Sequence, residues 1–230
     1  MIRFTDVHKT FDGKQVLAGV TFSVAAGEIL AIVGPSGTGK SVTLKHIVGL
    51  LEPDAGTVEV KPGARIGYLF QSGALLAWLT VRENVALPLT ETTKMPPDEV
   101  ARLTDEALAA VGLQDAADKY PAEISGGMVK RAGLARAIVR NADAVLYDEP
   151  TSGLDPVTAQ TIHRLIKRLN AERGLTSVVV THDLIGACAF ADRILLLDKG
   201  RVALVAPPKE FLESDIPAVR AFTAASKGEL

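Results

Sequence analysis

A glycine-rich run, Gly34-Pro-Ser-Gly-Thr-Gly-Lys-Ser41, restricts the fold of this chain more than any other feature of its sequence. It fits the pattern G-x-x-x-x-G-K-[ST], in which a loop with few Cβ atoms turns its backbone N–H groups toward phosphate oxygens. The short apolar run Glu28–Val33 precedes it and favours a buried strand. Apolar residues then recur at helical spacing, namely Leu44, Ile47, Val48 and Leu51. Strand, loop and helix in this order predict a nucleoside triphosphate site at the N-terminus of a helix.

The residues of this loop have distinct expected roles. Lys40 places a positive charge on the β- and γ-phosphate oxygens, and the Ser41 hydroxyl is a ligand for Mg²⁺. The remaining residues supply backbone N–H groups or shape the loop. The predicted phosphate-binding residues are Gly34, Pro35, Ser36, Gly37, Thr38, Gly39, Lys40 and Ser41.

Composition narrows the function classes. The 230 residues contain 25 Lys and Arg against 27 Asp and Glu, so the formal charge is −2. Such a chain lacks the broad basic face of a nucleic-acid binder, and we expect no nucleic-acid partner. With one cysteine it forms no internal disulfide, which fits a reducing cytosol. No apolar run reaches signal-peptide or membrane-spanning length, so a membrane role would require a partner.

Apolar strands alternate with helical patterns through much of the chain, which indicates a parallel sheet flanked by helices. Residues 2–26 predict an N-terminal antiparallel pair with a turn at Asp12–Lys14, and a turn at 54–56 leads to a further strand at Thr57–Val60. The remaining predicted strands are Arg65–Phe70, Ala144–Tyr147, Ser177–His182 and a hairpin over Leu195–Leu204 that turns at Lys199-Gly200.

A helix-rich stretch from about residue 72 to 142 interrupts this alternation and predicts an inserted helical subdomain. Within it, 98–111 is helical, and a second helix begins at Ser125 as N-cap and runs to about Arg140. A later helix begins at Pro156 and ends at Gly174. The fold class is therefore α/β, a single phosphate-loop domain over residues 1–230 with an antiparallel β-subdomain, a helical subdomain and a tail from about 209 to 230.

Polar residues follow the predicted strands at the edge where a ligand of a parallel sheet binds. Asp148 and Glu149 close one apolar strand, so Asp148 is expected to hold Mg²⁺ and Glu149 to polarise the attacking water. Gln71 follows another strand, and its neutral amide suits contact with both Mg²⁺ and this water. His182 follows a third strand, where it would bridge the γ-phosphate and the catalytic carboxylate.

Ile124-Ser-Gly-Gly-Met128 gives a second anion signal, because two glycines at a helix start expose several N–H groups. Ser125, Gly126 and Gly127 therefore form a second candidate phosphate site, although one chain already has its first in Gly34–Ser41. Two chains that sandwich nucleotide between them would explain the second copy.

Together these motifs resemble the nucleotide-binding subunit of ATP-binding-cassette (ABC) transporters over nearly the whole chain. In the terms of that family, Gly34–Ser41 is Walker A, Gln71 the Q-loop, Ser125–Met128 the signature, Val145–Glu149 Walker B, Ser152–Asp155 the D-loop and His182 the switch histidine. The resemblance implies ATP and Mg²⁺ as cofactors. It also implies that Phe11 stacks on the adenine, and the alternative for this residue is a phenylalanine packed in the core. The resemblance adds Val16, Val42 and Asp155 to the nucleotide-binding residues.

A narrower resemblance is to the ATPase of Mla-type transporters, which serve Mce-domain proteins and move phospholipids or related lipids between membranes. Its marks are Phe70–Leu75, Ser125–Arg131 with Met128 where Gln is common, and the tail segment Ile216–Phe222. Only about ten residues separate Thr57 from the strand before Gln71, so the longer β-subdomain insertion usual there is missing.

The resemblance implies a head-to-tail dimer in which Ser125, Gly126 and Gly127 of one chain cover the γ-phosphate held by the other. It also implies an integral membrane permease and an Mce-domain protein as partners, with the chain peripheral on the cytoplasmic face of the cell membrane. The segment after Gln71 to about Asn84 would contact the permease, with Trp78 or Leu79 exposed. Residues 209–230 would exchange across the dimer or fray.

Four alternatives stay open: transport of another cargo, a cassette acting on DNA or ribosomes, a regulatory cassette without hydrolysis, and a small-molecule kinase. A cassette that acts on DNA or ribosomes typically has two cassettes in one chain, long coiled coils or zinc modules, and none of these is present in the sequence. Glu149 and His182 argue against the regulatory cassette, and a kinase has no need of Ser125–Met128.

Overall fold

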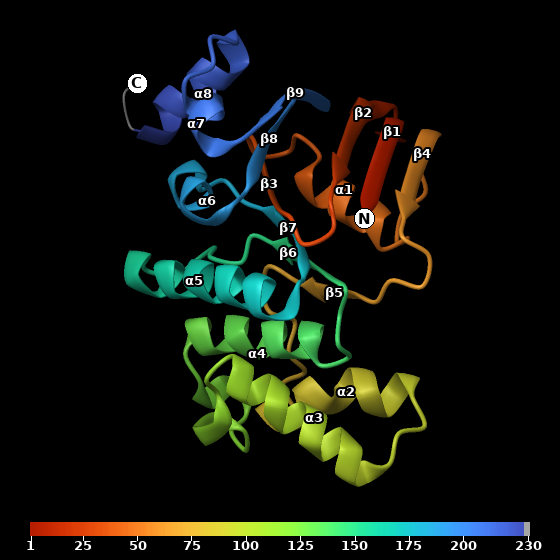
Figure 1. The fold of residues 1–230 in the computed structure, drawn as a ribbon, viewed down its shortest axis with the longest axis vertical. Coiled ribbons are helices and arrows are strands. Elements are labelled where there is room, and N and C mark those ends of the chain that lie inside the picture. Colours follow the sequence, from red (N-terminus) through yellow and green to blue (C-terminus); the bar gives the residue numbers. More distant parts are fainter. Residues whose placement is uncertain (228–230) are drawn as a thin grey trace.

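A six-stranded sheet forms the centre of the protein, as seen in a computed structural model that describes residues 1–227 (Figure 1). Its strands lie in the order β5-β6-β7-β3-β8-β9. All neighbours pair in parallel except β8 and β9, which form the predicted hairpin at Lys199-Gly200. The strands are β3 Ile29–Val33, β5 Ile66–Leu69, β6 Ala144–Asp148, β7 Thr176–Val180, β8 Arg193–Asp198 and β9 Arg201–Ala206.

A separate three-stranded antiparallel sheet, in the order β2-β1-β4, lies beside helix α1 (Figure 1). It contains β1 Ile2–Phe11, β2 Lys14–Val24 and β4 Ala55–Val60, and α1 spans Lys40–Ile47. The prediction placed Ala55 and Gly56 in a turn, but β4 already begins at Ala55 because that residue pairs with His8 of β1. The β4–β5 connection is short, as the sequence predicted.

The helical subdomain lies between β5 and β6 in the chain and on the far side of α5 from the antiparallel sheet (Figure 1). It contains α2 Val81–Thr92, α3 Pro97–Ala110, the short helices η1 Gln114–Ala116 and η2 Pro121–Glu123, and α4 Gly126–Ile138. Thr80 and Glu83 form a capping box at the start of α2, which satisfies two N–H groups that the helix leaves free.

Two more pairs of helices complete the fold. Helix α5, Pro156–Arg173, begins with proline and ends at Gly174 in the left-handed conformation, and α6 spans Leu184–Phe190. Helices α7, Pro208–Leu212, and α8, Pro217–Lys227, form the tail. In the described part of the tail, Phe211 and Val219 are buried against the central core of their own chain, so these residues do not fray. Exchange of the tail across a dimer stays a prediction, and residues 228–230 lie outside the described residues.

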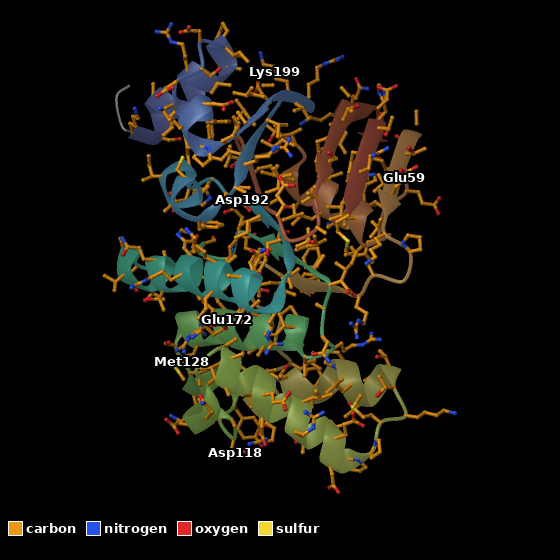
Figure 2. All side chains as sticks on the ribbon, viewed as in Figure 1. Glu59, Asp118, Met128, Glu172, Asp192 and Lys199 are labelled. Carbon is orange, nitrogen blue, oxygen red and sulfur yellow. The ribbon has the colours of Figure 1, made fainter. Side chains whose placement is uncertain are left out.

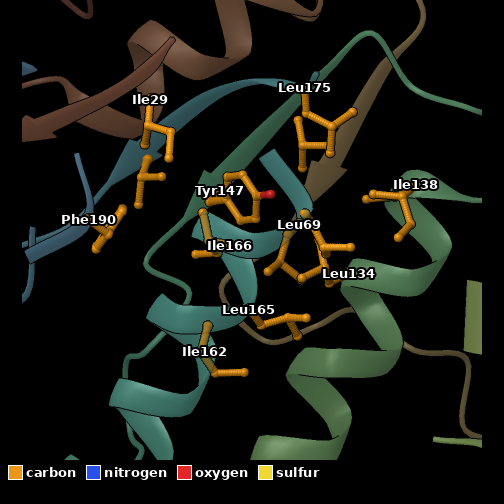
Figure 3. Close-up of a cluster of buried hydrophobic side chains, with 14 of the residues drawn as sticks. Ile29, Leu69, Leu134, Ile138, Tyr147, Ile162, Leu165, Ile166, Leu175 and Phe190 are labelled. Carbon is orange, nitrogen blue, oxygen red and sulfur yellow. The ribbon is translucent and has the colours of Figure 1, made fainter. Parts of the chain in front are cut away.

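The main core lies between one face of the central sheet and the helices α4, α5 and α6 (Figure 3). Tyr147 of β6 is fully buried there, among Leu134 of α4 and Ile166 of α5. A second core fills the space between the other face of the sheet, α1 and the antiparallel sheet. Among the helices of residues 1–227, none has both the length and the apolar character that crossing a membrane requires.

Candidate functional site

The loop between β3 and α1 is fixed by close packing against the antiparallel sheet. Gly39 precedes α1 with a φ of 101°, and a Cβ atom there would lie 2.7 Å from a methyl group of Leu17 in β2. A side chain at this position would therefore strain the backbone and displace the side chain of Leu17. Val16 of β2 reaches the same glycine with its carbonyl oxygen, which places it beside the loop as the resemblance implied.

Lys40 folds back over its own loop. Its ammonium donates to the carbonyl oxygens of Gly34, at 2.7 Å, and Pro35, at 3.0 Å. Burial lowers the pKa of Lys40, while the charges of Glu149 and Asp148 act in the opposite direction. The two carbonyl oxygens hold the charge of Lys40 above the loop, at the position where the sequence predicted phosphate.

Ser41 and Asp148 belong to two motifs that lie far apart in the sequence, and the fold brings them into contact. The Ser41 hydroxyl donates to Oδ1 of Asp148 at 2.8 Å, because α1 and β6 both begin or end at the same edge of the sheet. Hard oxygen donors of this kind suit Mg²⁺, so these two residues fit the ion that the sequence predicted. The Tyr68 hydroxyl donates to the other oxygen, Oδ2, at 3.1 Å.

Glu149 and His182 form the expected pair. Nδ1 of His182 lies 2.8 Å from Oε2 of Glu149. The Glu149 side chain is 14% exposed and that of His182 is 68% exposed, so the histidine forms the solvent side of the pair. Glu149 has a φ of 48°, a left-handed backbone that is rare outside glycine and that turns its side chain away from the line of β6.

Gln71 lies just past β5, but its side chain makes no hydrogen bond to Ser41 or Asp148, the two residues that fit Mg²⁺. Its amide Nε2 donates to Oγ of Ser152 in the D-loop at 3.3 Å. Phe11, at the end of β1, is 39% exposed, with the Lys9 ammonium 5.6 Å from its ring centre. The alternative of a packed core phenylalanine is therefore wrong, and the ring is free to cover a base. Val42 is half-buried against the second core.

Ser125 caps α4, as predicted, by accepting a hydrogen bond from the Met128 N–H at 3.4 Å. Met128 lies at the start of that helix in the lower half of the molecule (Figure 2). Gly127 is buried, and a Cβ atom there would lie 2.5 Å from Cγ2 of Thr158 in α5. Only glycine therefore permits this approach of α4 to α5 without displacement.

Asp155 caps the neighbouring helix α5 by accepting from the N–H groups of Val157 and Thr158, both at 3.0 Å. Hydrogen bonds from Thr158 hold the pKa of Asp155 below its ordinary value. Asp155, Ser125 and Gly126 are exposed to solvent.

Apart from Gln71 and Val42, the predicted site residues fall into two groups, which we call the loop half and the signature half. The loop half joins the Gly34–Ser41 loop with Phe11, Val16, Asp148, Glu149 and His182. The signature half consists of Ser125, Gly126, Gly127 and Asp155. Helix α1 lies beside the antiparallel sheet, whereas α4 lies beyond α5 (Figure 1).

Two contributors were missed by the sequence analysis. Tyr68 holds Asp148, and Lys130 of α4 donates to the backbone carbonyl oxygens of Gln71 and Glu149. Lys130 shares the buried face of α4 with Gly127 and Leu134 at spacings of three and four residues. A charged residue on an apolar helical face was the signal that could have identified it.

A phosphate-binding loop on a parallel sheet, beside a serine–aspartate pair and a glutamate–histidine pair, defines a nucleoside triphosphatase. The chain belongs to the ABC transporter family, whose profile matches residues 17–152. It is an ATP-hydrolysing cassette, with ATP as its cofactor.

Three curated relatives differ in what their names say. Protein TRIGALACTOSYLDIACYLGLYCEROL 3, chloroplastic, of Arabidopsis thaliana is 37% identical over 98% of this chain and 74% of its own length. The probable ribonucleotide transport ATP-binding protein mkl of Mycobacterium tuberculosis is 39% identical, over 96% and 66%. The methionine import ATP-binding protein MetN of Caulobacter vibrioides is 40% identical, over 100% and 74%. The chain thus spans about two thirds to three quarters of their lengths.

Solved structures agree with this fold. The dimeric bacterial ABC transporter cassette MJ0796 has a TM-score of 0.81 and 34% identity, over 90% of this chain and 99% of that one. A dimeric structure of the same cassette in a post-hydrolysis state, bound to ADP and Pi, has a TM-score of 0.80.

Proposed function

We propose that this chain is the ATP-hydrolysing subunit of a transporter, that it acts as a head-to-tail dimer on a membrane permease, and that its cargo is a phospholipid or a related lipid. The observation that carries the dimer is the division of the site into a loop half and an exposed signature half. A second copy would supply its own Ser125, Gly126 and Gly127 to the loop half of the first. The cassette MJ0796, similar over 90% of this chain, is dimeric.

Each residue of the loop half has a role in this proposal. Bound ATP would supply the phosphoryl group that is transferred to water. Lys40 and Mg²⁺ would neutralise the negative charge of its phosphates. Ser41 and Asp148 would hold the Mg²⁺, and Glu149 would accept the proton of the attacking water. Gln71, whose amide bonds Ser152 here, would join the ion only after that hydrogen bond is released. His182 would orient Glu149 through the 2.8 Å contact between Nδ1 and Oε2, and it would face the γ-phosphate of bound ATP.

Phe11, Val16 and Val42 would frame the nucleotide on the other side of the loop. The signature half completes the site from the second copy, where Asp155 links the two sites. ATP would thereby favour the closed dimer, and hydrolysis would remove that preference.

The segment 72–84 supports a membrane partner. Trp78, the only tryptophan of the sequence, is 72% exposed, whereas Leu75, Leu76 and Leu79 are half-buried. A large exposed indole next to the Q-loop is a typical anchor of an interface. This arrangement supports a permease contact at the cytoplasmic face of the cell membrane.

The lipid cargo is supported by the resemblance of the Gln71 and Met128 segments to Mla-type ATPases. The Arabidopsis relative is also named for a galactolipid, trigalactosyldiacylglycerol. Another cargo is the second candidate, because the mycobacterial and Caulobacter relatives are named for ribonucleotide transport and methionine import. An Mce-domain protein is expected as a partner only with the lipid cargo.

The deciding experiment is a gentle-detergent pull-down of this chain from its native membrane, with proteins and lipids identified by mass spectrometry. Recovery of a permease, an Mce-domain protein and enriched phospholipid would support the proposal. A permease with a different binding protein and no enriched lipid would replace the cargo. The variant Trp78→Asp should lose the permease, and Trp78→Phe, which keeps an aromatic ring, should retain it.

A further inference from the structure

Lys130 connects the helical subdomain to the catalytic end of β6. Its side chain lies on the buried face of α4, and the residue is only 6% exposed. The ammonium donates to the backbone carbonyl oxygen of Gln71 and, at 3.2 Å, to that of Glu149. One side chain therefore joins α4, the first residue of the Q-loop segment and the residue proposed to accept the proton of water.

The Glu149 backbone needs such support. A left-handed conformation outside glycine is strained, and it persists only where its surroundings hold it. The Glu149 N–H donates to Val180 at 2.9 Å, and its carbonyl oxygen accepts from the Ser152 N–H at 3.2 Å as well as from Lys130. Lys130 is the support that comes from outside the core strands and their own loop.

The same helix also binds the segment that follows Gln71. The Arg136 guanidinium donates to the carbonyl oxygens of Gly73, at 2.8 Å, and Ala74, at 2.7 Å. A Cβ atom at Gly73 would lie 2.7 Å from Val129 of α4, so the two segments are in close contact. Residues 71–74 and α4 therefore form one unit, and Lys130 is a point at which this unit touches Glu149.

We propose that Lys130 is a positioning residue for ATP hydrolysis, which makes the orientation of Glu149 depend on the place of the Gln71–Ala74 segment relative to the core. The inference rests on the catalytic role proposed for Glu149. A displacement of the segment by a membrane partner would reach Glu149 through two hydrogen bonds to one ammonium group.

The test compares three variants by steady-state hydrolysis, ATP affinity and thermal unfolding. Lys130→Met keeps the length of the side chain but removes its donors, and we expect kcat to fall roughly 10- to 100-fold with KM and ATP affinity unchanged. Lys130→Arg restores donors and should recover most of kcat. Arg131→Met is the matched control, because Arg131 donates to Val111 and Gly112 within the helical subdomain, and its loss should leave kcat unchanged.

A double-mutant cycle separates positioning from a general loss of structure. In single-turnover measurements on the Glu149→Gln background, Lys130→Met should add no further loss, because its target is already removed. An equal loss in both backgrounds, or a rise in KM with unchanged kcat, would overturn the inference. If Lys130→Met fails to fold, Lys130→Gln takes its place in the cycle.

These results also separate the two proposals. Normal turnover in Glu149→Gln would overturn the role of Glu149 itself. Normal turnover in Lys130→Met beside an inactive Glu149→Gln would overturn the role of Lys130 alone.

Discussion

The loop half and the signature half of the site are built in different ways. In the loop half, three polar side chains have partners within the chain: Lys40 binds loop carbonyl oxygens, Ser41 binds Asp148, and Glu149 contacts His182. In the signature half, the hydroxyl of Ser125 and the carboxylate of Asp155 accept only from the N-termini of their own helices, and both residues are exposed.

This difference indicates what each half needs in order to act. The loop half is preorganised, so nucleotide binding requires no second chain. The signature half presents helix N-termini, whose N–H groups would bind the phosphate of a nucleotide that another chain holds. Substitutions in the signature half should therefore reduce ATP turnover without reducing ATP binding by a single chain.

The largest effect should come from Ser125→Glu. A carboxylate at the start of α4 would repel the γ-phosphate held by the second chain, so we expect turnover below detection while a single chain still binds ATP. Hydrolysis and equilibrium ATP binding measure the two quantities. Ser125→Ala, which loses the cap but adds no charge, should keep part of the turnover. An equal loss of ATP binding in Ser125→Glu would assign Ser125 to the site of its own chain.

Glu149→Gln tests the loop half. Loss of the general base should reduce hydrolysis by a factor of roughly 10² or more, while ATP binding remains. Phosphate release and nucleotide binding check this result. Glu172→Gln, an exposed position near the end of α5, is the control and should match the unsubstituted chain. Near-normal turnover of Glu149→Gln would contradict the assignment.

Tyr68→Phe should have a smaller effect on the same half. Burial and the charge of Asp148 raise the pKa of Tyr68, so its hydroxyl remains a donor to that carboxylate at physiological pH. Without it, the Mg²⁺ concentration for half-maximal turnover should rise about ten-fold, as for other residues that orient a metal ligand. Tyr120→Phe, at an exposed tyrosine, is the control. An unchanged Mg²⁺ titration would exclude this role.

The smallest effect concerns the signature half. Asp155→Ala removes the cap of α5 and should lower the free energy of unfolding by about 1 kcal/mol, whereas Asp155→Asn retains a capping oxygen and should change it little. Denaturant unfolding of the two variants measures the difference. Equal stability of both variants would show that the carboxylate has no capping role.

Local runs of sequence predicted most of this architecture. The phosphate loop, Asp148-Glu149 and Ser125 each lie at a strand end or helix start that a few neighbouring residues specify. Tyr68 was missed because its partner Asp148 lies 80 residues away. Lys130 was missed because its partners Gln71 and Glu149 lie 59 and 19 residues away, and both acceptors are backbone oxygens that no residue type marks. The start of β4 was missed for a similar reason, since its pairing with β1 determines it.

The parallel pairing of β5 with β6 has one more consequence. Ile66 lies opposite Ala144. The chain therefore leaves the central sheet after β5, forms the helical subdomain and returns as β6, the strand next to β5. A change in the length of the helical subdomain would therefore leave the strand order as it is, provided that buried residues such as Val85 of α2 and Leu108 of α3 still complete the main core.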